Sequence, residues 1–317
     1  RAIKEALRPI PLERTDFIAF GRAYADELYG LGKIPTGRRY RSILTKIEQF
    51  VGGQLSLSDV TVDFVRRYQV HMVEERKNGP STVASNLRAI KSLINRAIKA
   101  GLFPSDESPF KDIQVKEPPG KKQKLSALEV RAIQDLEFAP ETPAWHVRHY
   151  WLFSMYTGGV RFRDIATLRV QDVREGRLSY RMSKTGGLKN LEIPPIAADI
   201  LVHYLPGRKP EEFVFPILGQ KYDLSSPEKF DRAVQSQNAY VNKILKEIAT
   251  SAGLPISLSF HQSRHSFANM ALDDGWSVRK IQAALGHKDY QTTERYLREL
   301  GVEFTGEELG RLFSNPE

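Results

Sequence analysis

The first third of the chain carries apolar residues at helical spacing, and this periodicity constrains the fold more than any other feature. Apolar residues that recur every three or four positions form one face of a helix, which must then pack against another element. Segments of this kind between residues 16 and 100 predict four amphipathic helices in a small bundle. Their apolar faces carry Phe17, Phe20, Tyr24 and Leu28; Tyr40, Ile43, Leu44, Ile47 and Phe50; Val62, Val65, Val70 and Val73; and Val83, Leu87, Ile90, Leu93, Ile94 and Ile98.

Glycines and small polar residues separate these helices. Gly30 ends the first pattern, and Gly52 follows the second. Ser58 and Ser81 precede the third and fourth patterns, where a hydroxyl can accept a hydrogen bond from a free backbone N–H. We therefore expect these two serines to be the N-caps, and we expect the fourth helix to stop at Gly101.

The segment 114–124 shows no hydrophobic periodicity and is rich in Pro, Gly and Lys. Paired prolines keep a backbone extended and cannot continue a helix. We interpret this segment as an interdomain linker that is cationic enough to lie along a phosphate backbone. An exposed linker with ordinary solubilising lysines is the alternative.

Residues from Ser126 onward are mostly helical in pattern, with one exception at 173–194. There Leu178, Tyr180 and Met182 alternate with polar residues before a glycine-containing connection, which predicts a β-hairpin. The expected fold class is therefore mostly α with a small antiparallel β-sheet. We expect four regions: 1–113, the linker 114–124, 125–302 and a short tail 303–317.

The charge of the chain is unevenly distributed. The 317 residues carry a net charge of +9, and residues 1–124 account for all of it, with 23 Lys and Arg against 14 Asp and Glu. This asymmetry favours an extended polyanion as the partner of the first half. A composition of 41% hydrophobic and 27% charged residues is typical of globular proteins, and no apolar run is long enough to cross a bilayer.

Cysteine is absent, which excludes a disulfide scaffold, a thiolate zinc site and a cysteine nucleophile. The chain does not open with the apolar region of a signal peptide, so a cytoplasmic protein without a membrane partner is the expectation.

Three segments of the second half concentrate histidine, arginine and tyrosine. In the first, Arg161 follows Gly158-Gly159 in an apolar stretch, and Asp164 stands where its carboxylate can orient the guanidinium. A purely structural Arg–Asp pair is the alternative. In the second, His261 and Arg264 lie three apart and so share one helical face.

His261 and His265 have the spacing of a zinc-binding pair, which is a further alternative for the second segment. Gln262 stands where a zinc protease has its glutamate base, and no third ligand is nearby, so we expect no metal. In the third segment, His287 follows Gly286 at the end of a helical pattern, and Tyr296 lies nine residues later. Taken singly, these two residues are consistent with helix capping and packing.

Together, these positions resemble the catalytic set of the tyrosine recombinases, the phage integrase family. The set is Arg161, Lys184, His261, Arg264, His287 and Tyr296, in this order along the chain. The turn Ser183-Lys184-Thr185-Gly186 resembles the family's mobile lysine hairpin, and the bundle at 16–100 resembles its SAM-like core-binding domain. The resemblance implies a helical-bundle core-binding domain followed by a mixed α/β catalytic domain.

The resemblance also implies site-specific DNA cleavage and rejoining through a 3′-phosphotyrosyl intermediate, in the service of a mobile element. Tyr296 would be the nucleophile, His261 the base, and Lys184 the acid for the leaving oxygen, while Arg161, Arg264 and His287 would contact the phosphate. The phosphodiester is exchanged for a phosphotyrosine ester, so neither a cofactor nor a metal is required.

Double-stranded DNA is the expected partner, and the tail is expected to dock on a neighbouring protomer of a homotetramer through Leu309, Leu312 and Phe313. An accessory DNA-bending protein is left open. Cationic residues in the first half and the linker are the expected DNA contacts: Arg38, Arg39, Arg41, Arg88, Lys91, Arg96, Lys99, Lys121, Lys122 and Lys124.

Two other functions use the same residues. A type IB topoisomerase-like enzyme shares the chemistry but relaxes supercoils without a target site. A non-catalytic DNA-binding protein on the same scaffold is the second alternative, and it is disfavoured because every catalytic position is filled.

Overall fold

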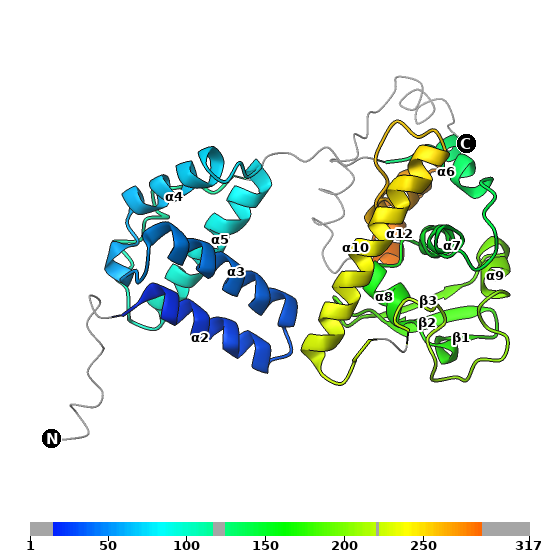
Figure 1. Cartoon of the computed structure of the whole chain (residues 1–317), viewed down its shortest axis with the longest axis horizontal. Helices are drawn as coiled ribbons and strands as arrows, with labels where there is room; N and C mark the ends of the chain where they lie inside the picture. Colours follow the sequence, from blue (N-terminus) through cyan, green and yellow to red (C-terminus); the bar gives the residue numbers. More distant parts are fainter. Residues whose placement is uncertain (1–14, 117–123, 220–221, 287–317) are drawn as a thin grey trace, which may run out of the picture. The chain divides into compact units, whose positions relative to one another are not determined.

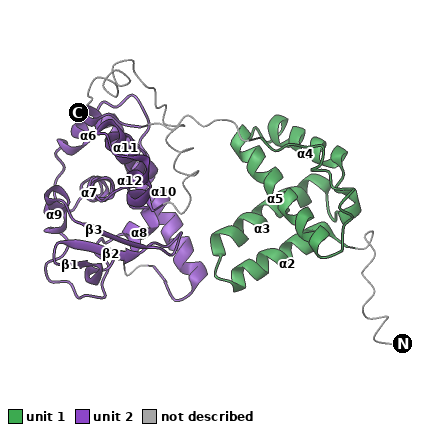
Figure 2. Ribbon diagram, turned by 180° about the vertical axis from the view of Figure 1, so that it is seen from behind, with its two compact units in different colours: residues 1–119 green, residues 120–317 purple. Residues whose placement is uncertain are grey.

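The computed structural model describes residues 15–116, 124–219 and 222–286. The chain divides into two compact units, 1–119 and 120–317 (Figure 2). This division falls inside the segment 114–124 that the sequence marks as the linker. The described part is mostly helical with one small antiparallel sheet, which confirms the expected fold class (Figure 1).

Unit 1 is a bundle of helices around one apolar core. Helix α2 begins after Asp16, whose side chain accepts hydrogen bonds from the N–H groups of Ile18 and Ala19. Gly21 lets α2 and α3 approach closely, because a Cβ at this position would lie 2.7 Å from Leu44 Cδ2. The elements are α2 (Phe17–Gly30), α3 (Ile34–Val51), the short helix η2 (Leu57–Asp59), α4 (Val62–Glu74) and α5 (Pro80–Lys99).

The third and fourth helices differ in detail from the expectation. Thr61 is the N-cap of α4, because Ser58 belongs to η2, and Gly79 rather than Ser81 precedes α5. Val70 and Val73 are exposed, and the buried face of α4 is formed by other residues. These are Phe64, Val65, Tyr68 and Met72.

Unit 2 is built around α7, which is buried almost throughout and carries Trp151 with no exposed surface. Figure 1 shows this helix nearly end-on in the middle of the unit. The helices are α6 (Ala127–Gln134), α7 (Pro143–Tyr156), α8 (Phe162–Thr167), the short helix η3 (Val170–Asp172), α9 (Pro195–Leu201), α10 (Pro227–Ser251), α11 (Phe260–Asp273) and α12 (Val278–Leu285).

The sheet contains the predicted hairpin and one further short strand. Strands β1 (Val173–Arg174), β2 (Arg177–Arg181) and β3 (Leu188–Glu192) pair antiparallel in sequence order. The register places Tyr180 opposite Lys189. Between β2 and β3, the carbonyl of Met182 accepts a hydrogen bond from the N–H of Gly186, which closes the turn that carries Lys184.

A histidine cluster joins α7 to the end of α9. The hydroxyl of Tyr204 lies 2.9 Å from His146 Nδ1 and 3.2 Å from His149 Nδ1, and the ring of His203 stacks on His149. Burial, reinforced by the nearby charges of Arg148, His203 and His146, lowers the pKa of His149 to about 4. A neutral His149 is therefore part of the folded state.

Acid should destabilise unit 2 through His149. An unfolded histidine binds its proton near pH 6.5, whereas the folded protein binds it only near 4, so stability is lost as the pH falls through this window. We expect a loss of about 1–3 kcal/mol between pH 7 and pH 4.5. Urea unfolding followed by tryptophan fluorescence measures it, since Trp145, Trp151 and Trp276 all belong to unit 2.

The variant His149→Phe keeps an aromatic ring in the cluster and removes this titration, so its stability should depend less on pH. The matched control is His71→Phe, which removes a histidine from unit 1. An equal acid loss in wild type and His149→Phe would contradict the assignment.

Candidate catalytic site

A glycine turn between α7 and α8 positions Arg161. Gly158 and Gly159 both have positive φ, 75° and 67°, a conformation that side chains with a Cβ rarely adopt. The turn reverses the chain after α7, and Arg161 then stands at the N-cap of α8. Two consecutive residues with positive φ favour a glycine pair at these positions.

Arg264 is buried in α11 and binds two backbone carbonyls from other elements. Its Nη1 donates to the carbonyl of Gly159 at 2.8 Å, and its Nη2 donates to the carbonyl of Leu285 at 2.6 Å. Only 3% of the residue is exposed. Gly159 packs directly on it, since a Cβ there would lie 2.9 Å from Arg264 Cγ. One guanidinium thus connects α11, the glycine turn and the end of α12.

Arg161, His261 and Arg264 line the same cavity of about 190 Å³. Arg161 comes from the start of α8, while His261 is exposed in the first turn of α11 and Arg264 lies one turn further along. The structure therefore brings together three of the predicted catalytic residues, from segments 100 residues apart. Two guanidinium groups and an imidazole at one small cavity are suited to binding an oxyanion.

Asp164 does not pair with Arg161, contrary to the expectation from the sequence. Its Oδ1 accepts a hydrogen bond of 2.9 Å from the N–H of Ser183, at the start of the lysine turn. Its Oδ2 is buried and has no hydrogen-bond partner among the described residues. Asp164 therefore holds the hairpin turn next to Lys184 instead of orienting the arginine.

Met182 is a contact of Arg161 that lies at the start of the lysine turn. Its Sδ lies 3.8 Å from Arg161 Nη1 and 3.9 Å from Thr185 Oγ1. A Cβ on Gly286, the left-handed C-cap of α12, would overlap this sulfur. Strand alternation predicts only that Met182 lies on the same face as Leu178 and Tyr180, so the contact with Arg161 has no signal in the sequence.

The remaining catalytic candidates are placed less fully. Lys184 lies in the turn between β2 and β3 and is exposed. His287 and Tyr296 lie outside the described residues, and Gly286 is the last described residue before them. The structure therefore places the backbone up to Gly286, and the catalytic roles of His287 and Tyr296 stay predictions.

Several of the expected DNA contacts in unit 1 already bind other residues of the unit. Arg39 donates to the carbonyl of Ser85, Arg41 pairs with Asp26, and Arg96 pairs with Glu27 and stacks on Tyr24. Arg38 is half-buried. One face of α5 forms a cavity of about 420 Å³ lined by Arg88, Lys91, Ser92, Asn95, Arg96 and Lys99.

The end of the linker is attached to unit 2. Lys124 Nζ donates to Asn269 Oδ1 at 2.6 Å, and the N–H of Leu125 donates to Ser266 Oγ. Both acceptors belong to α11, the helix that carries His261 and Arg264. Lys121 and Lys122 lie outside the described residues.

His261 and His265 meet edge to face, with ring centroids 4.5 Å apart. Across the described ranges, no group of three or more histidine, aspartate and glutamate side chains is placed to hold a metal ion. No helix in the same ranges is long and apolar enough to cross a membrane.

Comparison with known proteins gives matches to both units. Residues 124–301 match the Phage integrase family, and residues 16–115 match the Phage integrase SAM-like domain. The tyrosine recombinase XerC of Roseiflexus castenholzii is 28% identical over 269 residues, which cover 81% of this chain and 81% of that protein.

Two solved structures show the same fold. The Tn1549 transposon integrase, in complex with circular intermediate DNA, is similar over 95% of this chain and 100% of its own, with 16% identity and a TM-score of 0.67. The lambda integrase tetramer bound to a Holliday junction is similar over 92% of this chain and 79% of its own, with 19% identity and a TM-score of 0.64.

Gly159 offers a direct test of how Arg264 is positioned. Gly159→Ala should weaken the binding of inorganic sulfate at least tenfold, because the added Cβ displaces Arg264 from the cavity. Gly207→Ala is the matched control, since Gly207 has a φ of 76° but no atom near the position of a Cβ. Both variants should lose about 1 kcal/mol of stability from the strained backbone.

Sulfate titrations followed by NMR measure the loss of affinity, and thermal unfolding measures the loss of stability. Unchanged sulfate affinity in Gly159→Ala would mean that Arg264 does not depend on the glycine turn.

Proposed function

The chain belongs to the phage integrase family of tyrosine recombinases, and we propose on that premise that it cleaves and rejoins DNA with Tyr296 as its nucleophile. The matches confirm the resemblance inferred from the six catalytic positions. The observation that carries the proposal is the shared cavity of Arg161, His261 and Arg264. It provides a phosphate-sized site within unit 2.

In the proposed reaction, the Tyr296 oxygen attacks the scissile phosphorus and forms a 3′-phosphotyrosine ester, while the bond to the 5′ oxygen breaks. His261 accepts the phenol proton, which a group of reference pKa near 10 does not release readily at neutral pH. Arg161 and Arg264 bind the non-bridging oxygens and stabilise the negative charge of the transition state. His287 adds a hydrogen-bond donor there.

Lys184 is proposed to protonate the departing 5′ oxygen. Its exposed place in the turn suits a group that approaches the phosphate only after DNA has bound. Attack by a 5′ hydroxyl on the phosphotyrosine reverses these steps and rejoins the DNA. One phosphoester replaces another at each step, so the direction of recombination depends on partners or on DNA topology.

The comparisons do not favour the type IB topoisomerase-like alternative, since the relative from Roseiflexus castenholzii is a tyrosine recombinase and the SAM-like domain is matched as well. Double-stranded DNA is the proposed substrate, and the cationic face of α5 is proposed to contact it, because its lysines and arginines surround an open cavity. We propose a role in a mobile element, by analogy with the transposon integrase. The proposed place of action is the cytoplasm. An accessory DNA-bending protein remains part of the proposal.

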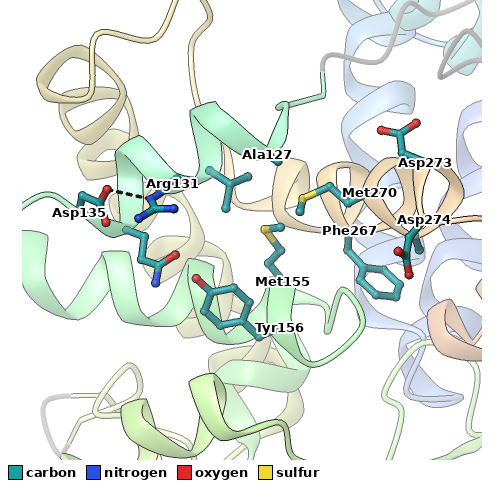
Figure 3. Close-up of a pocket in the computed structure, with 12 residues that line it drawn as sticks. Ala127, Arg131, Asp135, Met155, Tyr156, Phe267, Met270, Asp273 and Asp274 are labelled. Atoms are coloured by element: carbon teal, nitrogen blue, oxygen red, sulfur yellow. Dashed lines mark ion pairs between the residues drawn. The ribbon is translucent and has the colours of Figure 1, made fainter.

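A tetramer on DNA is proposed from two observations. The lambda integrase neighbour is a tetramer bound to a Holliday junction. Unit 2 also has a cavity of about 850 Å³ between α6, α7 and α11, whose apolar lining includes Met155, Phe267 and Met270 (Figure 3). We propose that this cavity receives residues 303–317 of a neighbouring copy, anchored by Leu309, Leu312 and Phe313.

The nucleophile can be tested by trapping covalent protein–DNA adducts on nicked duplexes made from the DNA that flanks the gene. Wild type and the control Tyr240→Phe, which removes an exposed hydroxyl on α10, should form the adduct. Tyr296→Phe should form none, and Arg264→Ala should react about 10²–10³-fold more slowly, because it lacks a group that binds the phosphate. Equal adduct from Tyr296→Phe would refute the assignment.

The tail can be tested separately from cleavage. Deletion of 303–317 should leave adduct formation intact but prevent formation of a four-protomer complex on paired sites, measured by analytical ultracentrifugation. Met270→Lys, which places a charge in the cavity, should have the same effect, whereas Leu128→Lys on the exposed side of α6 should not. Normal tetramers in the deletion variant would exclude the tail contact.

A further inference from the structure

Lys189 is a second lysine of the hairpin, and its surroundings differ from those of Lys184. It lies in β3, opposite Tyr180, and only 7% of it is exposed. Its Nζ donates a hydrogen bond of 2.9 Å to the carbonyl of Gly158. A Cβ on Gly158 would lie 3.3 Å from this nitrogen, so the ammonium rests against the glycine turn itself.

Among the described residues, the ammonium of Lys189 is bound by a backbone carbonyl and not by an ion-pair partner, although a buried charge normally requires one. A methionine would fill the same space at a lower cost in desolvation. Among the charges that act on Lys189, Arg264 and Arg161 oppose its protonation, while Asp164 favours it. Burial, together with the two arginines, lowers the pKa of Lys189 to about 7.

These observations connect Lys189 to the phosphate site through the backbone. Lys189 donates a hydrogen bond to the carbonyl of Gly158, and Arg264 donates one to the carbonyl of the next residue, Gly159. Arg161 follows two residues later. An anion bound between the arginines would offset the repulsion that they exert on Lys189. The charge of Lys189 and the occupancy of the site must therefore depend on each other.

We propose that Lys189 is a positioning residue that takes up a proton when a phosphate group binds Arg161 and Arg264, and that its ammonium then fixes the glycine turn beneath them. This inference rests on the proposed function of the site. The proton comes from solvent, because Lys189 lines a cavity of about 620 Å³ between the hairpin, the end of α7 and α12. No bond other than that to the proton forms or breaks.

Other titratable and charged groups face Lys189 or line the same cavity, and none of them is the carboxylate partner that a buried lysine would need. They are Tyr156 on α7, Arg161 and Asp164 at α8, Tyr180 on β2, Glu192 on β3, Arg264 on α11 and Lys280 on α12. Lys280 is exposed, stacks on Trp276 and does not line the cavity of Arg161 and Arg264, so it provides a matched control lysine.

Proton uptake makes anion binding depend on pH. In the pH range where Lys189 is protonated in the anion-bound protein but not in the free protein, the affinity for the anion falls up to tenfold for each unit of increasing pH. Inorganic sulfate is a suitable probe, because its own charge is constant between about pH 6 and 9. The dissociation constant of sulfate for the full chain would be measured by NMR titration across this range.

For wild type and Lys280→Met, we expect sulfate affinity to fall at least fivefold from pH 6.5 to pH 8.5. Lys189→Met should remove most of this pH dependence, and Lys189→Arg should also remove it while keeping the higher affinity at pH 8.5, since arginine stays charged. The NMR signal of ¹³Cε-labelled Lys189 should titrate near pH 7 without sulfate and at a higher pH with it.

Thermal unfolding of each variant shows whether it is folded. A Lys189→Met variant that keeps the wild-type pH dependence, or a Lys189 signal that sulfate does not shift, would overturn the proposal. If both variants fail to fold, the lysine signal of wild type decides alone. If the protein forms the covalent adduct but its sulfate affinity does not depend on pH through Lys189, only this inference is refuted. If the sulfate affinity shows this pH dependence but no adduct forms, only the proposed function is refuted.

Discussion

The site depends on the two hydrogen bonds that Arg264 donates to the carbonyls of Gly159 and Leu285. A buried guanidinium needs acceptors, and two of them here are carbonyls at the ends of other segments. The same contacts that satisfy the arginine also set the glycine turn before Arg161 and the end of α12 before His287. The contacts of Arg264 therefore also set the backbone that leads to two further catalytic candidates, Arg161 and His287.

Much of this arrangement could be predicted from the sequence, because helical periodicity, glycine positions and strand alternation are local signals. They located the four helices of unit 1 and the hairpin around Lys184. These local signals do not determine which of several similar apolar residues tertiary packing buries. Val70 and Val73 fit a helical face as well as Tyr68 and Met72 do, and only the shape of the neighbouring helices decides which face is buried.

The partner of Asp164 shows a second kind of failure. A spacing of three along a helix allows Arg161 and Asp164 to meet, but it does not show that a backbone N–H from residue 183 lies closer. That N–H comes from a hairpin whose position depends on contacts across the whole unit. The role of Met182 was hidden for the same reason, since strand alternation reports burial and not the identity of the neighbour.

The two lysines of the hairpin lie in different environments, which suits the different roles proposed for them. Lys184 is exposed in the turn, which suits the role proposed for it as proton donor to the departing 5′ oxygen. Lys189 is held at a fixed carbonyl in a buried position, where its charge is costly until an anion arrives. Net charge cannot distinguish these situations, and residues 125–317 contain equal numbers of acidic and basic residues. Under the proposed function, phosphate binding by unit 2 would depend on the placement of a few cations, and the excess charge of residues 1–124 would contact the rest of the duplex.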